Sequence, residues 1–331
     1  MLAMDAQSVS VAMCTFNGSR FLPEQLASIA AQSKTPYELV VCDDGSRDVT
    51  LEILRKFASS VKFPVRIVDN AGGQLGCTKN FERAIRLCEG TFISLADQDD
   101  IWLPQKLEVL STTLSNNPAA GYCFSDADLI DENSRLLGKR MWATVGFSRG
   151  KLADFRGTAQ VSTLLRRATV TGATMIFRAQ LRGLFLPLSS HLVHDYWIST
   201  LSSGLGFPGV PVAQPLVQYR RHSGQQIGPP DGSLLRKLRR AWNRNLDAYR
   251  NPMLGLEELS ARLHTARSMG FDFPEVHVQL VADSLAHATT RAQAHAERGT
   301  RRFIKVLPEV ATGRYARYSN SWASVVEDLC F

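Results

Sequence analysis

The segment TFISLADQDDIW, residues 91–102, joins a short apolar run to three closely spaced carboxylates. The apolar run has the length and composition of a buried strand. Asp97, Asp99 and Asp100 come directly after it. Carboxylates at the end of a buried strand repel one another, and their removal from water costs free energy unless a cation lies among them. An alternative is that they cap a helix beginning at Pro104, although three carboxylates exceed what one cap needs.

The residues on either side of this segment alternate between strand and helix patterns. Alternation at this spacing indicates βαβ units and a mostly parallel sheet covered by helices, which is an α/β fold. Ligands bind beyond the carboxyl ends of the strands in such sheets. The strands are expected at residues 9–16, 38–42, 65–68, 92–95 and near 121–124, and the helices at 21–32, 48–59, 78–88 and from 104.

Polar residues follow nearly every one of these strands. The carboxyl ends of parallel strands meet at one edge of a sheet, so the polar side chains are expected to line one site. They are Thr15 to Asn17, Asp43 to Ser46, Asp69 and Asn70, Asp97 to Asp100, and Ser125 and Asp126.

The alternation loosens after residue 131. Residues 134–170 carry many arginines and few periodic apolar positions, so a long excursion is expected there. From residue 233 onward the pattern is helical. The sequence therefore predicts two domains, 1–232 and 233–331. Between them we expect a strand at 171–177, a short helix at 193–201 and an irregular strand at 210–219.

Composition limits the class of protein. The chain has 331 residues, 44% of them hydrophobic, and can bury a sizeable core. Its net charge of +7 is compatible with a phosphorylated substrate or an anionic membrane surface. The six cysteines form no CxxC pair, which suits a reducing cytosol. The N-terminus lacks a secretory pattern, and prolines interrupt the uncharged run 196–219, so a soluble or peripheral protein is expected.

A dinucleotide-binding oxidoreductase also has such a sheet, but the sequence supports this class less well. It needs GxGxxG directly after the first strand, but the turn there reads CTFNGSR. The glycine-rich turn GGQLG, residues 72–76, follows the third strand instead, and the sequence has no Walker A motif.

Seven motifs in order resemble the family 2 glycosyltransferases, which have the GT-A fold. They are VSVAMCTFN, ELVVCDDGSRDVT, FISLADQDDIWLPQKL, SDADLID, TGATMIF, HDYW and QYRRH, and they cover roughly residues 9 to 225. DQDDIWLP with HDYW is similar to the rhamnosyltransferase-like branch that builds O-antigen and related surface polysaccharides. The resemblance implies an inverting, metal-dependent enzyme at the inner face of the cell membrane or free in the cytoplasm. Its donor would be dTDP-rhamnose or a UDP-sugar, and its acceptor a saccharide or a lipid-linked saccharide.

The resemblance also implies roles for individual residues around the carboxylate cluster. Asp99 is the expected ligand of Mg²⁺ or Mn²⁺, because a hard cation stabilises the charge of a departing nucleotide diphosphate. Asp97 matches the first carboxylate of the DxD motif, which faces ribose or metal-bound water, and Asp100 is expected to orient its neighbours. Phe16 matches the position whose ring packs on the nucleobase of the donor, and Asp44 matches the position that binds the edge of a pyrimidine nucleobase. The other expected donor contacts are Cys14, Asn17, Asp43, Lys79, Asn80, Arg220 and Arg221.

Two later positions complete the expected site. Asp195 in HDYW aligns with the general base, and His222 in QYRRH with a histidine that is a further metal ligand in some relatives. Arg220 and Arg221 suit a diphosphate because a guanidinium can pair bidentately with phosphate oxygens. Structural alternatives stay open for several of these residues. DDGS is a good turn, Lys79 suits a solvated helix face, His222 suits a surface loop, and Asp195 suits an N-cap.

Two other functional classes fit the motifs less well. A non-catalytic nucleotide- or glycan-binding module would not need Asp195, and a GT-A-like nucleotidyltransferase should carry a basic glycine-rich loop where CTFNGSR stands. Residues 224–230 suggest a lid or linker. Residues 233–250 have a basic amphipathic pattern, which suits either an anionic membrane surface or docking on the catalytic domain. His277, His287 and His295 are expected to decorate a helix.

Overall fold

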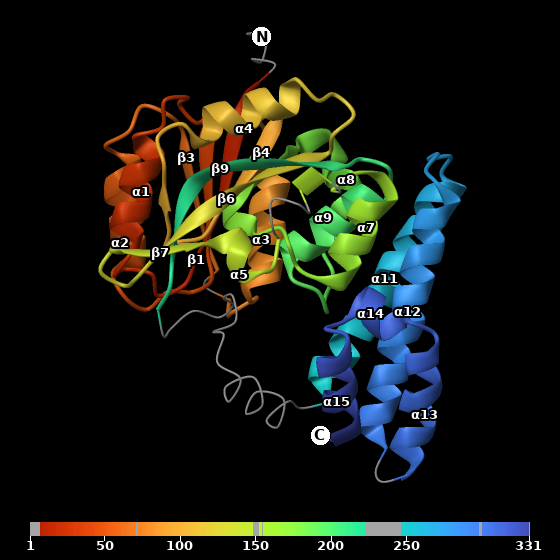
Figure 1. The fold of residues 1–331 in the computed structure, drawn as a ribbon. Helices are drawn as coiled ribbons and strands as arrows, with labels where there is room; N and C mark the ends of the chain where they lie inside the picture. Colours follow the sequence, from red (N-terminus) through yellow and green to blue (C-terminus); the bar gives the residue numbers. More distant parts are fainter. Residues whose placement is uncertain are drawn as a thin grey trace. The chain divides into compact units, whose positions relative to one another are not determined.

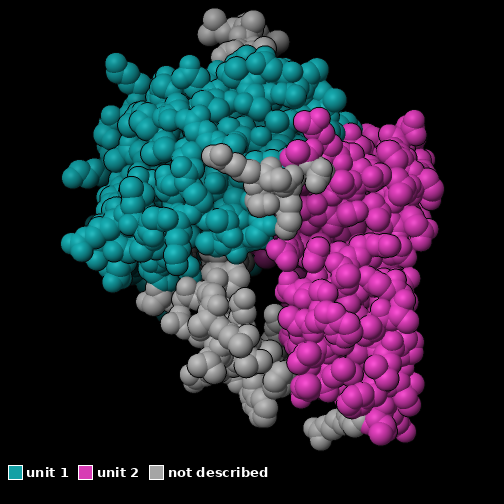
Figure 2. All heavy atoms as spheres, viewed as in Figure 1, with its two compact units in different colours: residues 1–152, 170–188, 207–228 teal, residues 153–169, 189–206, 229–331 magenta. Residues whose placement is uncertain are grey.

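The computed structural model describes residues 7–70, 72–147, 152–153, 155–222, 246–297 and 300–330. The chain divides into two compact units (Figure 2). Unit 1 comprises residues 1–152, 170–188 and 207–228, and unit 2 comprises residues 153–169, 189–206 and 229–331. The boundary expected after residue 232 lies outside the described residues, as do the suggested lid at 224–230 and most of the basic amphipathic segment 233–250.

Among the described residues of unit 1, nine strands form one mixed sheet (Figure 1). The strands β1 to β4 lie in the spatial order β3-β2-β1-β4 and are parallel to one another. The order continues β8-β6-β9-β5, with β7 paired to β6. The bounds are β1 Val9–Thr15, β2 Glu38–Asp43, β3 Val65–Asp69, β4 Phe92–Ala96, β5 Ile101–Trp102, β6 Tyr122–Ile130, β7 Leu136–Arg140, β8 Met175–Arg178 and β9 Gly209–Arg220.

Helices cover this sheet because its central strands are apolar on both faces. All residues of β2 and β4 are buried, and side chains such as Val11, Leu39 and Phe92 belong to one continuous core. Strands buried on both faces are typical of parallel sheets that carry helices on each side. The helices of unit 1 are α1 Leu22–Ala30, α2 Thr50–Ala58, α3 Cys77–Leu87, α4 Lys106–Ser115, α5 Met141–Thr144 and α8 Arg182–Phe185.

The expected excursion at residues 134–170 contains more regular structure than its sequence indicates. It includes β7, α5 and α7 (Gly157–Arg166). Trp142 packs edge-on against Phe124 and Phe147, with ring centroids 5.6 and 5.0 Å away. Scattered aromatic residues therefore anchor this segment, and such anchors produce no helical or strand period.

Unit 2 is helical. It contains α7, α9 (His194–Gly204), α11 (Asp247–Ser268), α12 (Glu275–Ala296), α13 (Thr300–Ala311), α14 (Arg314–Tyr318) and α15 (Trp322–Cys330). The helical pattern expected in the last part of the chain is thus confirmed for the described residues from 247 onward. Over the described ranges, no helix is both long and apolar enough to cross a membrane.

Three histidines of α12 occupy buried positions, so the prediction that they decorate a helix surface was wrong. The Nδ1 of His277 lies 3.0 Å from the Gly204 carbonyl oxygen. His287 contacts the Glu309 carboxylate at 2.8 Å, and His295 contacts the Asp328 carboxylate at 2.8 Å. Buried imidazoles are stable here because they have hydrogen-bond partners on neighbouring helices.

Candidate active site

The carboxyl ends of β1, β2 and β4 meet at one edge of the sheet, where β9 also ends. Asp99 follows β4, and His222 follows β9. The Nε2 atom of His222 lies 2.8 Å from Oδ2 of Asp99, and the two side chains are only 14% and 16% exposed. The ring of Phe21 packs against the imidazole with centroids 4.8 Å apart. A carboxylate and an imidazole from segments 123 residues apart are therefore held together in a sheltered position.

Asp100 points into the protein instead. Its side chain is fully buried, and Oδ1 accepts a hydrogen bond of 3.0 Å from the Arg220 backbone N–H. Burial raises the pKa of Asp100, and the nearby charges of Asp99 and Asp97 raise it further. Asp100 thus ties the loop after β4 to the end of β9, as the expectation that it orients its neighbours required.

Arg220 is the centre of this junction. Its fully buried guanidinium donates to the Asp99 carbonyl oxygen at 2.7 Å, to the Glu24 carboxylate at 2.8 Å and to the Ser134 hydroxyl at 2.9 Å. The same group stacks over the Phe21 ring at 4.7 Å. A contact from Arg220 to a diphosphate would require some of these bonds to break. The geometry assigns Arg220 a positioning role, whereas Arg221 is only partly buried.

The carboxylates do not cap the helix that follows them. Helix α4 begins at Lys106, its N-cap is Gln105, and no side chain caps it. Lys106 itself is fully buried. Its Nζ donates to the Ala173 carbonyl oxygen at 2.7 Å and lies 3.2 Å from the Trp102 ring centroid. The capping alternative for Asp97, Asp99 and Asp100 was therefore wrong.

No motif in the sequence indicates the part that Gln98 plays. Its amide accepts a hydrogen bond of 2.8 Å from the Phe16 N–H and donates one of 3.1 Å to the Phe16 carbonyl oxygen. A Cβ atom at Gly18 would lie only 2.2 Å from the Gln98 amide oxygen, so a larger residue there would displace this amide from Phe16. Gln98 thereby joins the loop after β4 to the end of β1 and fixes the backbone of Phe16.

The two aspartates after β2 serve different purposes. Asp43 is fully buried, and its carboxylate accepts bonds from the Thr15 hydroxyl, the Ser46 hydroxyl and the Ser46 N–H at 2.6 to 2.7 Å. Asp43 therefore shapes the DDGS turn, in which Gly45 has a φ of 82°. Asp44 accepts bonds from the N–H groups of Leu75 and Gly76 at 2.7 and 2.9 Å.

The remaining expected donor contacts are spread along the same strand ends. Cys14 is partly buried in β1, and Asn17 is exposed, with a positive φ of 47° and its side chain bonded to the Arg47 N–H. Lys79 forms an ion pair with Glu82 at 3.3 Å on α3. Asn80 is buried, and its amide donates to the Cys42 carbonyl oxygen at 2.6 Å. Asp97 is partly buried. Contacts of these residues with a donor stay predictions.

Asp195 belongs to unit 2, where it occupies the first turn of α9. The N-cap of α9 is Val193, so the alternative that Asp195 is the N-cap residue was wrong. Its Oδ1 accepts a bond of 2.6 Å from the Tyr196 N–H. The neighbours His194 and Trp197 are buried, and burial lowers the pKa of His194. Its role as the base stays a prediction.

The contact between Asp99 and His222 fits a divalent cation. A carboxylate oxygen and an imidazole nitrogen are ligand types that Mn²⁺ accepts in proteins. Within the described ranges, no group of three or more His, Cys, Asp or Glu side chains could hold a metal ion. Two protein ligands are sufficient where phosphate oxygens and water fill the other positions. The residues present are therefore compatible with a cation shared with a nucleotide diphosphate.

Known proteins share this sequence pattern. The family model for glycosyl transferase family 2 matches residues 10–179 of the 331-residue chain. The chain is 32% identical over 139 residues to the UDP-Glc:alpha-D-GlcNAc-diphosphoundecaprenol beta-1,3-glucosyltransferase WfgD of Escherichia coli, covering 41% of this chain and 51% of WfgD. It thus spans about half the length of that relative. It is 24% identical over 227 residues to the dTDP-rhamnosyl transferase RfbG of Shigella flexneri, covering 65% and 73%.

Solved structures share the fold. TarS 1–349 of S. aureus, in complex with UDP-GlcNAc, superposes with a TM-score of 0.57 at 18% identity, covering 85% of this chain and 72% of that one. The mannosyltransferase PcManGT of Pyrobaculum calidifontis, in complex with GDP-Man and Mn²⁺, gives a TM-score of 0.52 at 17% identity, covering 99% and 88%. The expected GT-A fold with C-terminal helices is confirmed, and the chain belongs to glycosyl transferase family 2.

Proposed function

We propose that this protein is an inverting glycosyltransferase that moves a sugar from a nucleotide-diphosphate donor to a hydroxyl group of a saccharide. The contact between Asp99 and His222 at 2.8 Å carries the proposal. It places a carboxylate and an imidazole beyond the carboxyl ends of the parallel strands, which is where doubly wound sheets bind their ligands. Asp44 and Phe16 follow the two neighbouring strands at the same edge.

Asp99 and His222 would hold a divalent cation in this site. When bound, such a cation stabilises the negative charge that develops on the departing diphosphate. Arg220 and Asp100 keep the two ligands in place, because one bonds the Asp99 carbonyl oxygen and the other bonds the backbone two residues before His222. A ligand pair that is positioned before the donor arrives loses little free energy to reorganisation.

Asp195 is the proposed general base. The acceptor oxygen forms a bond to the anomeric carbon on the face opposite the diphosphate while the bond from that carbon to the diphosphate oxygen breaks. The hydroxyl proton passes to the Asp195 carboxylate, and the electron pair of the broken bond leaves with the diphosphate. Gln98 bonds both the N–H and the carbonyl oxygen of Phe16. The Phe16 ring would stack on the nucleobase of the donor, and Asp44 would bind the edge of that nucleobase.

The relatives suggest which substrates to test. RfbG is named as a dTDP-rhamnosyl transferase, and WfgD as a glucosyltransferase that uses UDP-Glc and a diphosphoundecaprenol-linked acceptor. We therefore propose dTDP-rhamnose or a UDP-sugar as the donor of this protein, and a lipid-linked saccharide as its acceptor. Synthesis of a surface polysaccharide is the process that such a reaction would serve.

A screen of nucleotide sugars tests the proposal. The purified full chain is mixed with dTDP-rhamnose, UDP-glucose, UDP-GlcNAc and GDP-mannose, with Mn²⁺ or with EDTA. Calorimetry reports binding, and release of the nucleoside diphosphate reports hydrolysis or transfer. We expect one donor to bind and react only with Mn²⁺. Equal turnover in EDTA would remove the cation from the proposal, and failure of every donor to bind would remove the function.

A further inference from the structure

A carboxylate on the first turn of α1 is joined to the centre of the candidate active site. The Oε2 atom of Glu24 accepts a hydrogen bond of 2.8 Å from the Arg220 guanidinium. It also accepts one of 2.7 Å from the hydroxyl of Ser134, which lies in the turn between β6 and β7. The Ser134 oxygen in turn accepts a bond of 2.9 Å from Arg220. Side chains from three distant segments thus form a closed ring of hydrogen bonds.

Glu24 brings a negative charge to this ring. Bonds from the Ser134 hydroxyl and the Arg220 guanidinium lower the pKa of the Glu24 carboxyl, so it is ionised near neutral pH. The Glu24 side chain is 50% exposed, whereas the Arg220 side chain is 0% exposed. A buried guanidinium is costly unless a charge of opposite sign lies beside it. Glu24 supplies that charge from the protein surface.

Arg220 connects Glu24 to both proposed metal ligands. Its Nε atom donates to the Asp99 carbonyl oxygen at 2.7 Å, so the guanidinium fixes the backbone that carries one ligand. The other ligand, His222, follows Arg220 by two residues at the end of β9. A displaced guanidinium would therefore disturb the loop after β4 and the end of β9 at the same time.

The ring of Phe21 provides a second connection to the imidazole. The Arg220 guanidinium lies 4.7 Å from the Phe21 ring centroid, and the His222 ring centroid lies 4.8 Å from it. Phe21 is the N-cap residue of α1 and is only 8% exposed. A closely packed interior has few voids that could absorb a displacement. The guanidinium and the imidazole therefore depend on each other's position through this ring.

The charge of Arg220 also affects how well a cation binds. A guanidinium next to Asp99 and His222 repels a divalent cation, and this repulsion is strong where little water separates the charges. The Glu24 carboxylate, 2.8 Å from the guanidinium, offsets the repulsion. Residues that hold metal ligands from behind typically change metal affinity by about 10- to 100-fold.

We propose that Glu24 is a positioning residue for Asp99 and His222, and that it strengthens their affinity for a divalent cation by neutralising Arg220. Glu24 acts through Arg220 and touches neither the donor nor the reacting atoms. This role rests on the proposed function, which supplies the cation.

Glu24→Gln tests the role because it removes the charge and keeps the size of the side chain. Glu132→Gln is the matched control. Glu132 pairs with Arg20 at 3.1 Å, and Arg20 also lies 4.7 Å from the Phe21 ring centroid, but the Arg20 side chain is 61% exposed, so water screens the pair. In titrations of the full chain with Mn²⁺ alone, followed by electron paramagnetic resonance, we expect Glu24→Gln to bind about tenfold more weakly and the control to match the wild type.

A second measurement requires neither metal nor donor. The Nε2 atom of His222 lies 2.8 Å from the Asp99 carboxylate, and an ionised carboxylate can only accept, so Nε2 donates in this contact. Nitrogen NMR of ring-labelled histidine reports which ring nitrogen carries the proton, and His222→Gln assigns the signals. Glu24→Gln should shift the His222 signals toward a mixture of tautomers. Glu24→Asp, which keeps the charge, should recover part of both effects.

The positioning role is contradicted if Glu24→Gln leaves the His222 signals and the Mn²⁺ affinity at wild-type values, or if Glu132→Gln changes them equally. A loss of stability in urea without either change would make Glu24 a structural residue only. Equal losses in Glu24→Asp and Glu24→Gln would contradict the part played by charge. If the wild type bound no Mn²⁺, the proposed cation would be wrong, and the His222 signals would still decide the positioning role.

Discussion

Asp99 and Asp100 are adjacent in the chain but face different surroundings. Asp99 contacts His222 and retains some exposure, whereas Asp100 is fully buried and bonds the Arg220 backbone. One carboxylate is therefore available to a ligand, and its neighbour holds the strand that carries His222. This division explains why two consecutive aspartates can be accommodated at the end of a buried strand despite their repulsion.

Asp99→Asn should reduce turnover by about 100-fold or more while the protein stays folded. The amide keeps the shape of the side chain but lacks the negative charge that a cation needs. The measurement is release of the nucleoside diphosphate with saturating Mn²⁺, together with a thermal unfolding curve. Asp272→Asn, an exposed aspartate just before α12, is the control and should keep wild-type turnover. Full turnover in Asp99→Asn would exclude the residue as a metal ligand.

Asp195→Asn should abolish transfer but leave donor binding intact. Asparagine cannot take the proton of the acceptor hydroxyl. Since the N-cap of α9 is Val193, the substitution should cost little helix stability. Donor affinity by calorimetry and transfer to an acceptor in single turnovers separate the two effects. Near-normal transfer by a folded variant would remove Asp195 from the mechanism.

The sequence pointed to carboxylates at the strand ends better than to the residues that position them. Asp44 and Asp99 stand out because consecutive aspartates after a strand exceed what a turn or a cap needs, although Asp44 is buried and accepts bonds from two backbone N–H groups. Gln98 and Glu24 do not stand out, because their roles depend on partners 82 and 196 residues away. The buried state of Arg220 was missed for the same reason. A motif gives residue types, but hydrogen-bond partners between distant segments come only from the fold.

At the scale of single elements, regular patterns were reliable and irregular ones were not. The period of apolar residues predicted β1 to β4 and α1 to α4 within a few residues of their observed bounds. The segment around β7 was missed because all five of its residues are exposed, so it carries no alternating pattern. Helix α7 was missed although its buried residues Val161, Leu164 and Leu165 stand at i, i+3 and i+4, because this spacing spans little more than one turn.

The end of β9 offers a test that distinguishes two adjacent arginines. Arg220→Gln should lower the free energy of unfolding by about 3 kcal/mol, because it leaves buried partners such as the Asp99 carbonyl oxygen without a donor. Arg221→Gln should leave stability unchanged and raise the KM for the donor, since Arg221 is only partly buried and suits a phosphate contact. Urea unfolding and steady-state kinetics measure the two effects. Equal stability of both variants would contradict the positioning role of Arg220.

At the scale of the whole molecule, the two units are stabilised by different means. The parallel sheet of unit 1 surrounds an apolar core. Unit 2 buries a polar network in which the Asp328 carboxylate accepts bonds from Arg291, His295 and the Tyr315 hydroxyl at 2.6 to 2.8 Å. Burial alone would raise the pKa of Asp328, but the bonds from His295 and Arg291 outweigh it and lower the pKa to about 2. A network of this kind makes stability depend on pH.

Asp328→Asn should destabilise the protein by about 3 kcal/mol near neutral pH, because the Arg291 charge loses its buried partner. The depressed pKa in the folded state means that Asp328 contributes stability above its unfolded pKa of about 4, and that this contribution is lost as the pH falls toward about 2. The difference between wild type and variant should therefore be present at about pH 5 and shrink below about pH 4. Urea unfolding of both proteins at several pH values measures it.

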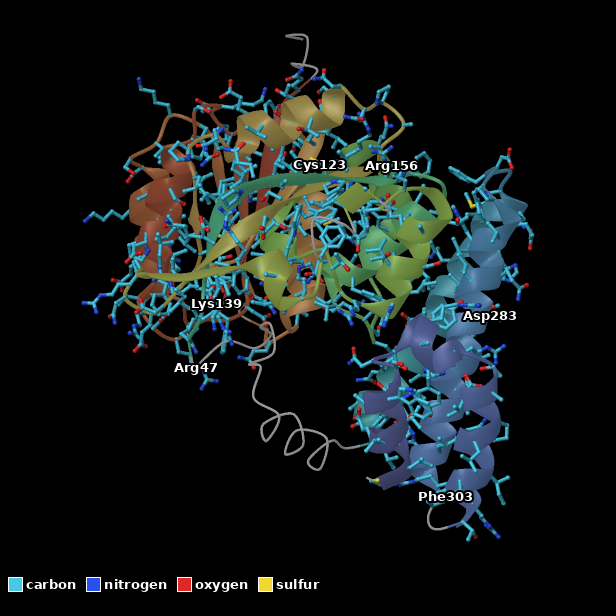
Figure 3. The ribbon with its side chains drawn as sticks, viewed as in Figure 1. Arg47, Cys123, Lys139, Arg156, Asp283 and Phe303 are labelled. Carbon is cyan, nitrogen blue, oxygen red and sulfur yellow. The ribbon has the colours of Figure 1, made fainter. Side chains whose placement is uncertain are left out.

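Asp283→Asn is the matched control for this pH dependence. Asp283, which Figure 3 labels on α12, pairs with Arg314 at 3.2 Å but is 25% exposed, so water screens the pair. The control should lose about 1 kcal/mol or less. A wild-type advantage over Asp328→Asn that persisted undiminished at about pH 3 would show that packing, and not the ionised carboxylate, stabilises this part of the molecule.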